Sequence, residues 1–398
     1  MNKVPLLHRP CVAVAMSGGV DSSVAAALLA EKGYRVFGVT MKLWCYAGTE
    51  ASARSCCSLS AIEDAKSVSS ALGIPHYVLD FESCFDSEVV SPFCSDYLRG
   101  RTPNPCVVCN SRLKFDVLLD RVRAMGADFL ATGHYAIVER TGPGAWRLRR
   151  AADRGKDQSY VLWGMEKERL PGILFPLGEM TKKEVRAMAG RLGLRSANRP
   201  ESQDVCFVES GSCGDFVSER LSKKGISISP GQIVDVSGKR LGTHEGLVHF
   251  TIGQRHGLGV SSAERMYVVA LRPETNTLVV GRRSCLLGRK FECGDVNWIT
   301  YRKIELPLKA LVQVRYTHEP ALAVIRAADG TGPSDAVLLS GCQKREACGV
   351  TVCFEADQSS ITPGQSAVFY LEDEVIGGGV IEKVNCAQEE SNPQPSDP

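Results

Sequence analysis

The feature that most constrains the fold is an alternation, between residues 11 and 132, of short continuous apolar runs with segments of helical periodicity. The apolar runs, which predict buried strands, cover residues 11–16, 34–41, 76–80 and 128–132. The periodic segments, which predict helices, cover residues 21–32, 58–72 and 111–125. Strands that are apolar throughout need cover on both faces, so the pattern predicts a parallel sheet between helical layers. Ligands of such sheets bind beyond the carboxyl ends of the strands.

The remainder of the chain changes to a mostly β pattern. A hairpin is predicted near residues 141–144, helical segments continue to Leu194, and from about Gly225 short β-branched runs recur between glycines and prolines. A chain of 398 residues is too long for one core. We therefore predict an α/β parallel-sheet domain over residues 1–209, a small central domain over 210–281, a β-barrel-like domain over 282–384 and a disordered, Pro-rich tail over 385–398.

Overall charge does not indicate a nucleic-acid partner, because the formal net charge is only +2. Local charge is more informative, since basic residues gather in two stretches. Their cationic side chains are Arg147, Arg149, Arg150, Arg154 and Lys156, then Lys182, Lys183, Arg186, Arg191, Arg195 and Arg199. Each stretch fits either contact with phosphates or the solvated face of a hairpin or helix, and charge alone leaves both interpretations open.

The 16 cysteines fit a reducing compartment. A secreted domain so rich in cysteine would be small and disulfide-bonded, whereas in a chain of this length most are expected to be reduced, buried apolar residues. Residues 1–10 lack the apolar core of a secretory signal, and no apolar run reaches the ~18 residues of a membrane span. We therefore predict a cytoplasmic protein without a membrane partner.

The first chemical motif is the heptapeptide SGGVDSS, residues 17–23, between a predicted strand and a predicted helix. Its glycines allow the backbone to turn its N–H groups inward, the helix N-terminus adds partial positive charge, and serine hydroxyls donate to phosphate oxygens. The motif lacks the Lys-Ser/Thr end of a Walker loop and the GxGxxG spacing of a dinucleotide fold. It therefore predicts an anion cradle of another kind; the alternative is a capped Gly-rich turn.

The second motif is TPNPCVVCN, residues 102–110. Its prolines stiffen the loop, and Cys109 and Asn110 stand where the next predicted helix starts. A thiolate at a helix N-terminus is stabilised, so this position predicts a reactive thiol. The alternative is half of a zinc site, although the adjacent Cys56 and Cys57 match a second CxxC poorly.

A third motif, SQDVCFV over residues 202–208, is uninformative alone, because a cysteine between valine and phenylalanine is usually a core residue. Together, however, the motifs resemble a known family. The heptapeptide resembles the PP-loop of ATP pyrophosphatases, and nearly the whole chain resembles the bacterial tRNA-specific 2-thiouridylases and their mitochondrial relatives. The matching blocks are AMSGGVDSS, TPNPCVVCN, ATGHYA, KDQSYVLW, FPLGEMTKKEVR, ESQDVCFV, HFTIGQRHGLG and PGQSAVFY.

The resemblance implies a role for each matching residue. The residues implied to bind ATP are Ala15, Met16, Ser17, Gly18, Gly19, Val20, Asp21, Ser22, Met41 and Gly133. The residues implied to contact tRNA are Asn104, Pro105, Cys106, His134, Lys156, Asp157, Gln158, Arg315, Tyr316 and Gln365, of which residues 104–106 face the target base. Cys206 matches the cysteine that carries a persulfide, and Cys109 matches its partner nucleophile. The chain departs from the family at Cys106, where aspartate is usual; this leaves open any acid–base role at that position and the choice of partner thiol.

The implied reaction explains why these parts occur together. The C2 oxygen of uracil is a poor leaving group, so ATP, with Mg²⁺, would adenylate it and make AMP the leaving group. A Cys206 persulfide would supply sulfur, and attack by Cys109 would free it and leave a disulfide. We expect a monomer with tRNA and a persulfide-bearing donor protein as partners, and we assign no residue to a metal. With this resemblance, we favour RNA contact for residues 147–156, while the interpretation of residues 182–195 as a solvated face stays open.

Two other functions stay open at this point. Another adenylating PP-loop enzyme, such as an amidotransferase-type synthetase that uses ammonia, would need no paired thiols. A zinc-stabilised RNA-binding module with a degenerate nucleotide fold would contain bound metal and would not convert ATP to AMP.

Overall fold

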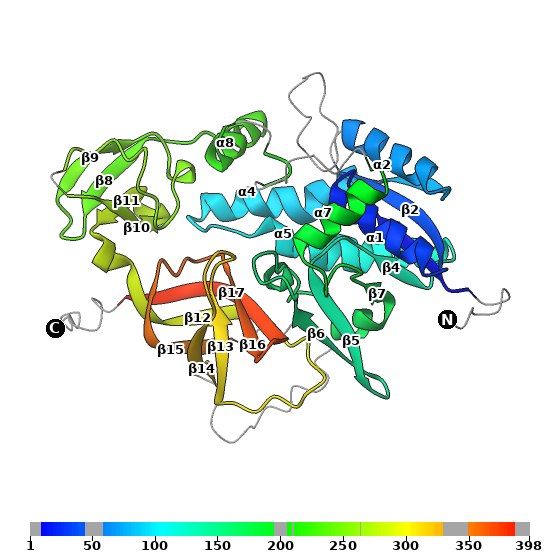
Figure 1. The fold of residues 1–398 in the computed structure, drawn as a ribbon. Coiled ribbons are helices and arrows are strands. Elements are labelled where there is room, and N and C mark those ends of the chain that lie inside the picture. The colour runs from blue at the N-terminus through cyan, green and yellow to red at the C-terminus, as the bar shows by residue number, and fades with distance from the viewer. Residues whose placement is uncertain are drawn as a thin grey trace.

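The computed structural model describes residues 9–43, 59–194, 205–208, 211–262, 264–328 and 349–386. The described strands form three sheets: a parallel one near the N-terminus, a small central one, and a closed antiparallel one near the C-terminus (Figure 1). The predicted fold class, an α/β parallel-sheet domain followed by a central domain and a barrel-like domain, is confirmed.

The N-terminal sheet has the strand order β3-β2-β1-β4-β7, and all of its pairs are parallel. Its strands are β1 (Cys11–Ala15), β2 (Arg35–Lys42), β3 (His76–Asp80), β4 (Phe129–Ala131) and β7 (Ile173–Leu174). Helices beside it are α1 (Val20–Glu31), α2 (Leu59–Ala71) and α7 (Lys182–Arg191). Cys11 and Ala13 of β1 pack in one core cluster, and Val12 and Val14 pack in another. Both faces of the strand are therefore covered, which is why its apolar run is continuous.

A helical layer that the sequence analysis did not predict follows β3. It comprises α3 (Glu82–Phe85), the π-helix η3 (Asp86–Val90) and α4 (Ser91–Leu98). Phe85, Val89, Phe93 and Tyr97 recur at helical spacing and are buried. The periodic signal for this layer is therefore present in the sequence.

The helix predicted over residues 111–125 begins earlier than predicted. The helical segments α5 (Pro105–Val108), π-helix η4 (Cys109–Leu118) and α6 (Leu119–Ala124) follow one another without a break. The Asn104 side chain accepts a hydrogen bond from the Cys106 N–H, and Pro105 occupies the first turn, where a missing N–H costs little. The prediction that Cys109 stands at the helix start is therefore wrong, because the helix starts four residues earlier, at Pro105, after its capping asparagine.

The predicted hairpin near residues 141–144 is present, and one of its strands also pairs with a strand from the C-terminal part of the chain. Strands β5 (Ala136–Gly142) and β6 (Ala145–Arg150) pair with each other, and Gly144 in their turn has a φ of 71°. β6 also pairs with β17 (Glu374–Cys386) of the C-terminal sheet. The hairpin therefore joins the parallel-sheet region to the barrel-like region.

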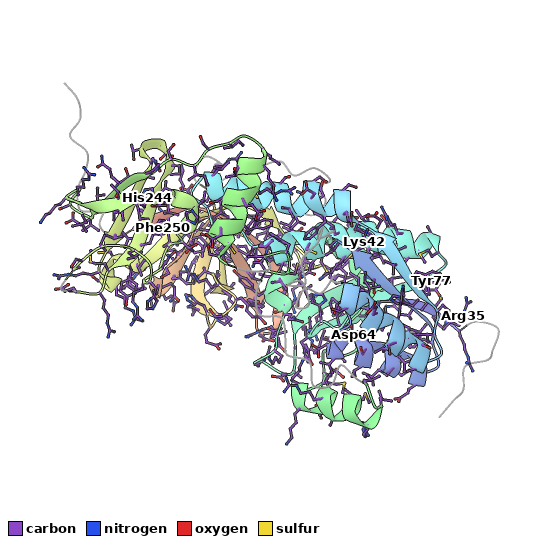
Figure 2. All side chains as sticks on the ribbon, turned by 90° about the horizontal axis from the view of Figure 1, so that it is seen from above. Arg35, Lys42, Asp64, Tyr77, His244 and Phe250 are labelled. Atoms are coloured by element: carbon purple, nitrogen blue, oxygen red, sulfur yellow. The ribbon has the colours of Figure 1, made fainter. Side chains whose placement is uncertain are left out.

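The central region carries its own small core. Helix α8 (Cys213–Lys223) precedes strands β8 (Gly231–Asp235), β9 (Arg240–His244), β10 (Tyr267–Arg272) and β11 (Thr277–Gly281), in the order β10-β11-β8-β9. The rings of His244 and Phe250 lie 5.7 Å apart in this region. Figure 2 shows them at the opposite end of the molecule from Arg35 and Tyr77 of the parallel sheet.

The C-terminal strands close on themselves. They are β12 (Leu287–Asn297), β13 (Leu308–Gln313), β14 (Ala321–Ala327), β15 (Val350–Ser359), β16 (Ser366–Leu371) and β17, in the order β12-β15-β14-β13-β16-β17. An additional antiparallel pairing of β12 with β17 completes the closure, and Asn385 and Cys386 take part in it. The remainder of the predicted tail, residues 387–398, lies outside the described residues. Short 3-10 helices are η5 (Ser159–Val161), η6 (Lys167–Gly172), η8 (Leu247–His249), η9 (Pro273–Thr275) and η10 (Arg283–Leu286).

None of the helices in the described ranges is long and apolar enough to cross a membrane. The cysteine side chains that the structure describes are reduced, in line with the sequence-based prediction for most of them.

The junction between hairpin and barrel generates a stability prediction. Leu148 of β6 is fully buried and lies opposite Val375 of β17, so Leu148→Ala leaves a cavity where the two regions meet. We expect a loss of about 2–5 kcal/mol in the free energy of unfolding, measured by urea denaturation. Leu287→Ala is the control, because this β12 leucine is 38% exposed and its truncation should cost less than about 1 kcal/mol. Equal losses for the two variants would contradict the assigned packing.

Candidate active site

The glycine loop joins the carboxyl end of β1 to the first turn of α1, where ligands of parallel sheets bind. Gly18 has a φ of 70°, and a Cβ atom on it would lie 2.5 Å from the Ala61 carbonyl oxygen, so only glycine fits. Gly19 caps α1 without a side-chain hydrogen bond. The N–H groups of the first turn, which starts at Val20, are therefore available to an anion.

Serine side chains hold this loop in shape. The Ser17 N–H donates to Ser22 Oγ (3.3 Å), and the hydroxyls of Ser22 and Ser23 donate to the Gly19 carbonyl oxygen (3.2 and 2.8 Å). Ser22 is buried, so its hydroxyl serves the turn in this structure rather than facing outward as a phosphate donor. The backbone N–H groups are the donors that the loop presents.

The first turn of α1 also contains an ion pair that the sequence analysis does not predict. Lys182 Nζ donates to both carboxylate oxygens of Asp21, each at 2.8 Å, and the Tyr135 hydroxyl donates to Asp21 Oδ1 at 2.8 Å. Three separate segments thus meet at one carboxylate. The cation of Lys182 lies beside the anion cradle, where it compensates the negative charge of Asp21.

The interpretation of residues 182–195 as a solvated helix face is wrong for Lys182. Lys182 is 8% exposed, whereas its neighbour Lys183 is exposed. A capping box formed by Thr181 and Glu184 fixes the first turn of α7, and Lys182 is the first residue of that turn. The sequence TKKE contains this capping signal, which could have shown where the helix starts.

Of the other residues that the resemblance assigns to nucleotide binding, one lies against the glycine loop and two lie in the core. A Cβ atom on Gly133 would lie 2.7 Å from both the carbonyl carbon of Asp21 and the nitrogen of Ser22, so Gly133 lies directly against the loop. Met16 and Met41 are buried core residues at the ends of β1 and β2, and Ala15 is partly buried. The structure thus brings Gly133 to the predicted cradle and places the two methionine side chains in the core.

The start of the α5 helix distinguishes the two cysteines of the CxxC motif. Cys106 is exposed in the first turn, whereas Cys109 is 8% exposed and packs in the main core cluster at the start of the π-helix. Asn110 is buried and its side-chain amide donates to the Val161 carbonyl oxygen (3.1 Å). The argument that a helix N-terminus stabilises a thiolate therefore applies to Cys106 rather than to Cys109.

The barrel region docks onto the loop before this helix. The Thr102 N–H donates to the Pro363 carbonyl oxygen (2.9 Å), and Gln365 Nε2 donates to the Thr102 carbonyl oxygen (2.7 Å). Gly364 between them has a φ of 90°, and a Cβ atom on it would lie 2.8 Å from the Thr102 nitrogen. Gln365, assigned to tRNA by the resemblance, thus holds the loop that presents Asn104.

The residues assigned to tRNA in the segment 156–158 are largely engaged within the protein. The Asp157 carboxylate accepts from Arg150 Nε (2.8 Å), and Gln158 Oε1 accepts from the Tyr135 N–H (3.0 Å). Lys156 is half-buried. Asp157 and Gln158 therefore order the segment around Tyr135, which in turn contacts the Asp21 carboxylate.

Arg315 joins the barrel to the central region. Its Nη2 donates to the Ile252 carbonyl oxygen (3.0 Å) and to Thr362 Oγ1 (2.6 Å), and burial lowers the pKa of its guanidinium. Tyr316, the next residue, is 48% exposed, and its ring lies 6.1 Å from that of Tyr160. Of these two residues assigned to tRNA, Tyr316 is the one that presents its side chain at the surface.

His134 lies in an aromatic niche next to the loop glycine Gly133. Its Nδ1 is 2.6 Å from Thr132 Oγ1, and its ring lies 5.8 Å from the rings of Phe115 and Phe175. Burial, and to a lesser extent the Lys114 ammonium, hold the pKa of His134 well below its usual range. The ring is therefore neutral at pH 7.

The segment that contains Cys206 is anchored by the next residue, Phe207, which is buried among aromatic rings. Phe207 is 2% exposed, and its ring lies 5.6, 5.1 and 5.2 Å from the rings of Phe85, Phe93 and Phe216. Cys206 itself is partly buried and packs against the same core cluster that contains Cys109. Both cysteines thus contact the large core cluster that extends from Cys11 of β1 to Val375 of β17.

No group of His, Cys, Asp or Glu side chains within the described residues is arranged to hold a metal ion. Cys56 and Cys57, the weak second half of the zinc alternative, lie outside those residues, and so do Arg195 and Arg199 of the second basic stretch.

Three family models match successive parts of the chain. A model described as tRNA methyl transferase HUP domain matches residues 10–210. Models described as tRNA methyl transferase PRC-barrel domain and Aminomethyltransferase beta-barrel domain match residues 214–282 and 340–381.

Curated relatives match over more of the chain than any single family model. The chain is 45% identical over 371 residues to the tRNA-specific 2-thiouridylase MnmA of Heliobacterium modesticaldum, covering 93% of this chain and 92% of the relative. It is 45% identical over 380 residues to the enzyme of that name from Pelotomaculum thermopropionicum, covering 94% and 98%. Among solved structures, a 4-thiouridine synthetase–RNA complex with bound ATP overlaps with a TM-score of 0.33 at 14% identity, over 50% of this chain and 45% of that one.

The Asp21–Lys182 pair generates a binding prediction. Lys182→Met removes the cation and leaves the Asp21 carboxylate uncompensated next to the predicted polyphosphate site. We expect the dissociation constant for ATP, measured by calorimetry, to rise at least ~10-fold, or about 1.4 kcal/mol. Lys183→Met is the matched control, because the neighbouring side chain is exposed and its loss should leave ATP affinity unchanged. A Lys182→Met protein that binds ATP as well as this control would contradict the assignment.

Proposed function

The chain belongs to the tRNA-specific 2-thiouridylase family of sulfurtransferases, and we propose that it adenylates the C2 oxygen of the wobble uridine of tRNA and then replaces that oxygen with sulfur. The observation that supports this most directly is that a helix N-terminus without a side-chain cap and a buried lysine meet beyond the carboxyl end of β1. Such a site suits a polyphosphate whose α-phosphate is attacked. The cysteines provide the second half of the reaction.

In the first step, the uracil oxygen attacks the α-phosphate of ATP and pyrophosphate leaves. The N–H groups of the first turn of α1 bind the departing phosphates, and Lys182 offsets the negative charge that Asp21 places there. Both oxygens of Asp21 are already engaged by Lys182, and one of them also by Tyr135. This carboxylate therefore does not fit a ligand for Mg²⁺, and we derive no step through a metal.

In the second step, the outer sulfur of a Cys206 persulfide attacks C2 and AMP leaves, which joins Cys206 to the base through a disulfide. The Cys109 thiolate then attacks the sulfur of Cys206. The bond between the two persulfide sulfurs breaks, the outer sulfur stays on the base as 2-thiouridine, and a Cys109–Cys206 disulfide remains. An external dithiol reduces that disulfide, and a persulfide-bearing donor protein reloads Cys206.

The positions of the cysteines support this division of roles. Cys206 stands in a segment fixed by Phe207, which suits a thiol that must present a sulfur in one direction. Cys109 is buried at the same apolar cluster, where it is shielded from competing oxidants. An amidotransferase-type synthetase would have no use for this arrangement, because ammonia needs no thiol carrier.

Cysteine variants test the proposal in a single turnover with tRNA, ATP and a persulfide donor. Cys206→Ser should accept no sulfur yet still adenylate tRNA, measured as AMP released when a nucleophile quenches the reaction, because the PP-loop is untouched. Cys109→Ser should load sulfur on Cys206 and fail to release free 2-thiouridine, since no thiol breaks the adduct. In the wild type without reductant, peptide mass spectrometry should find one Cys109–Cys206 disulfide.

Cys106→Ser is the internal control in this experiment, because Cys106 lies in the same motif and is the exposed thiol at the helix start. We expect this variant to retain the wild-type disulfide and 2-thiouridine yield. Loss of thiolation in Cys106→Ser together with retention in Cys109→Ser would assign the partner role to Cys106. If both variants retain thiolation, the two-thiol mechanism is overturned.

A further inference from the structure

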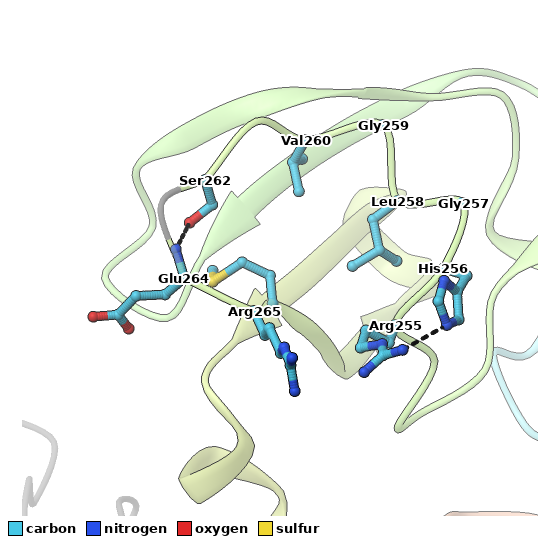
Figure 3. Close-up of a pocket in the computed structure, with 10 residues that line it drawn as sticks. Arg255, His256, Gly257, Leu258, Gly259, Val260, Ser262, Glu264 and Arg265 are labelled. Atoms are coloured by element: carbon cyan, nitrogen blue, oxygen red, sulfur yellow. Dashed lines mark hydrogen bonds between the residues drawn. The ribbon is translucent and has the colours of Figure 1, made fainter.

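The central region contains a pocket that takes no part in the site described above. It is a cavity of about 420 Å³ in the loop between η8 and β10, and its lining includes Arg255, His256, Leu258 and Arg265. In Figure 3 the side chains of Arg255 and Arg265 extend from the loop toward the same side. Most of the lining residues are exposed, so the pocket opens at the surface.

The pocket has an excess of positive charge. Neither Arg255 nor Arg265 forms an ion pair with any carboxylate in the described part of the chain. The one acid in the lining, Glu264, is already paired with Arg282, whose Nη2 donates to Glu264 Oε1 at 2.9 Å. Arg255 Nη2 lies 3.0 Å from His256 Nε2, a contact that brings no carboxylate to the arginine. Two arginines therefore remain uncompensated.

The loop that supports these arginines is fixed in shape. The Thr251 N–H donates to Gln254 Oε1, and Gln254 Nε2 donates to the His256 carbonyl oxygen, both at 3.0 Å. Leu258 is 6% exposed and packs in the core of the central region. The backbone of the loop is therefore anchored on both sides of Gly257, which fixes where Arg255 leaves the chain.

The backbone of this loop is also open to a ligand. Gly257 and Gly259 have φ values of 74° and 65°, and a Cβ atom on Gly259 would have no neighbour within 4 Å. Among the described residues, none accepts a hydrogen bond from the N–H groups of residues 255–260. Free N–H groups at left-handed glycines, next to arginine guanidinium groups, are the donors that recognise phosphate oxygens.

The base of the loop is tied to the region that holds the target-base loop. Arg315 donates to the Ile252 carbonyl oxygen, and a Cβ atom on Gly253 would lie 3.0 Å from Ser360 Oγ. The barrel that carries Arg315 also holds Thr102 through Gln365. The pocket is therefore linked through the barrel to the loop that precedes α5, although β10, which follows the pocket loop, lies in a different region of the molecule from α5 (Figure 1).

We propose that this pocket of the central region binds a backbone phosphate of tRNA outside the anticodon stem-loop, through Arg255, Arg265 and the free N–H groups of the loop. The inference rests on the proposed function, because it takes tRNA to be the substrate. An open, cationic pocket suits a polymer that carries a phosphate on every nucleotide, whereas a small free anion would be better held in an enclosed site. Together with the contact at the target base, this phosphate contact fixes the position of the long substrate relative to the thiols.

The test compares Arg255→Gln/Arg265→Gln with the wild type on two substrates, full-length tRNA and an isolated anticodon stem-loop. On full-length tRNA we expect affinity to fall about 10-fold at ~150 mM salt. The plot of log association constant against log salt concentration should also become shallower, by about 1 in slope for each phosphate that the variant no longer binds. On the stem-loop, the affinity should equal that of the wild type. Arg289→Gln is the control for loss of an arginine elsewhere on the surface, because this exposed barrel arginine is already paired with Asp357.

Each outcome decides one point. Unchanged affinity and slope on full-length tRNA would overturn the proposal, and so would an equal loss on both substrates, since the phosphate would then belong to the anticodon arm. Loss of affinity in the Arg289→Gln control as well would overturn the assignment to this pocket, because removal of any arginine would then have the same effect. Failure of the wild type to bind either RNA would refute the proposed function itself, and this result is distinct from the others.

Discussion

The geometry of the candidate site depends on the contacts that converge on the Asp21 carboxylate in the first turn of α1. Lys182 from α7 and Tyr135 from the segment after β4 both donate to it, and the Tyr135 N–H is held in turn by Gln158. Gly133 approaches the same turn so closely that no larger residue fits. These contacts fix the open end of the helix relative to the sheet, so its N–H groups are arranged before a phosphate binds. Preorganised donors of this kind stabilise developing charge without a cost of reorganisation.

The barrel region acts on the site from the other side. Through Gly364 and Gln365 it holds Thr102, and through β17 it pairs with β6 of the hairpin. The loop with Asn104 is therefore positioned by a part of the chain more than two hundred residues away in sequence. Several residues that the family resemblance assigns to tRNA have such internal partners. Their substitution is expected to change the position of the catalytic loop as well as any contact with RNA.

The sequence predicts the strands, the glycine loop and the hairpin because apolar periodicity and turn residues are local signals. It also predicts which side of the sheet carries the site. It does not show the pairing of β6 with β17 or the burial of Lys182, because both depend on contacts between distant segments. The helix start at Pro105 differs from the predicted one although its signals, an asparagine cap followed by proline, are local. That error matters, because it exchanges the environments of Cys106 and Cys109.

The central claim is that ATP activates the C2 oxygen of the uridine, and an oxygen-isotope measurement tests it most directly. A tRNA with ¹⁸O at C2 of the wobble uridine would be converted in one turnover, and the AMP would be isolated for mass spectrometry. Attack of that oxygen on the α-phosphate places it in AMP, so the account predicts AMP with one ¹⁸O atom for each 2-thiouridine formed. Unlabelled AMP, with the ¹⁸O recovered in water or retained in the tRNA, would contradict the account.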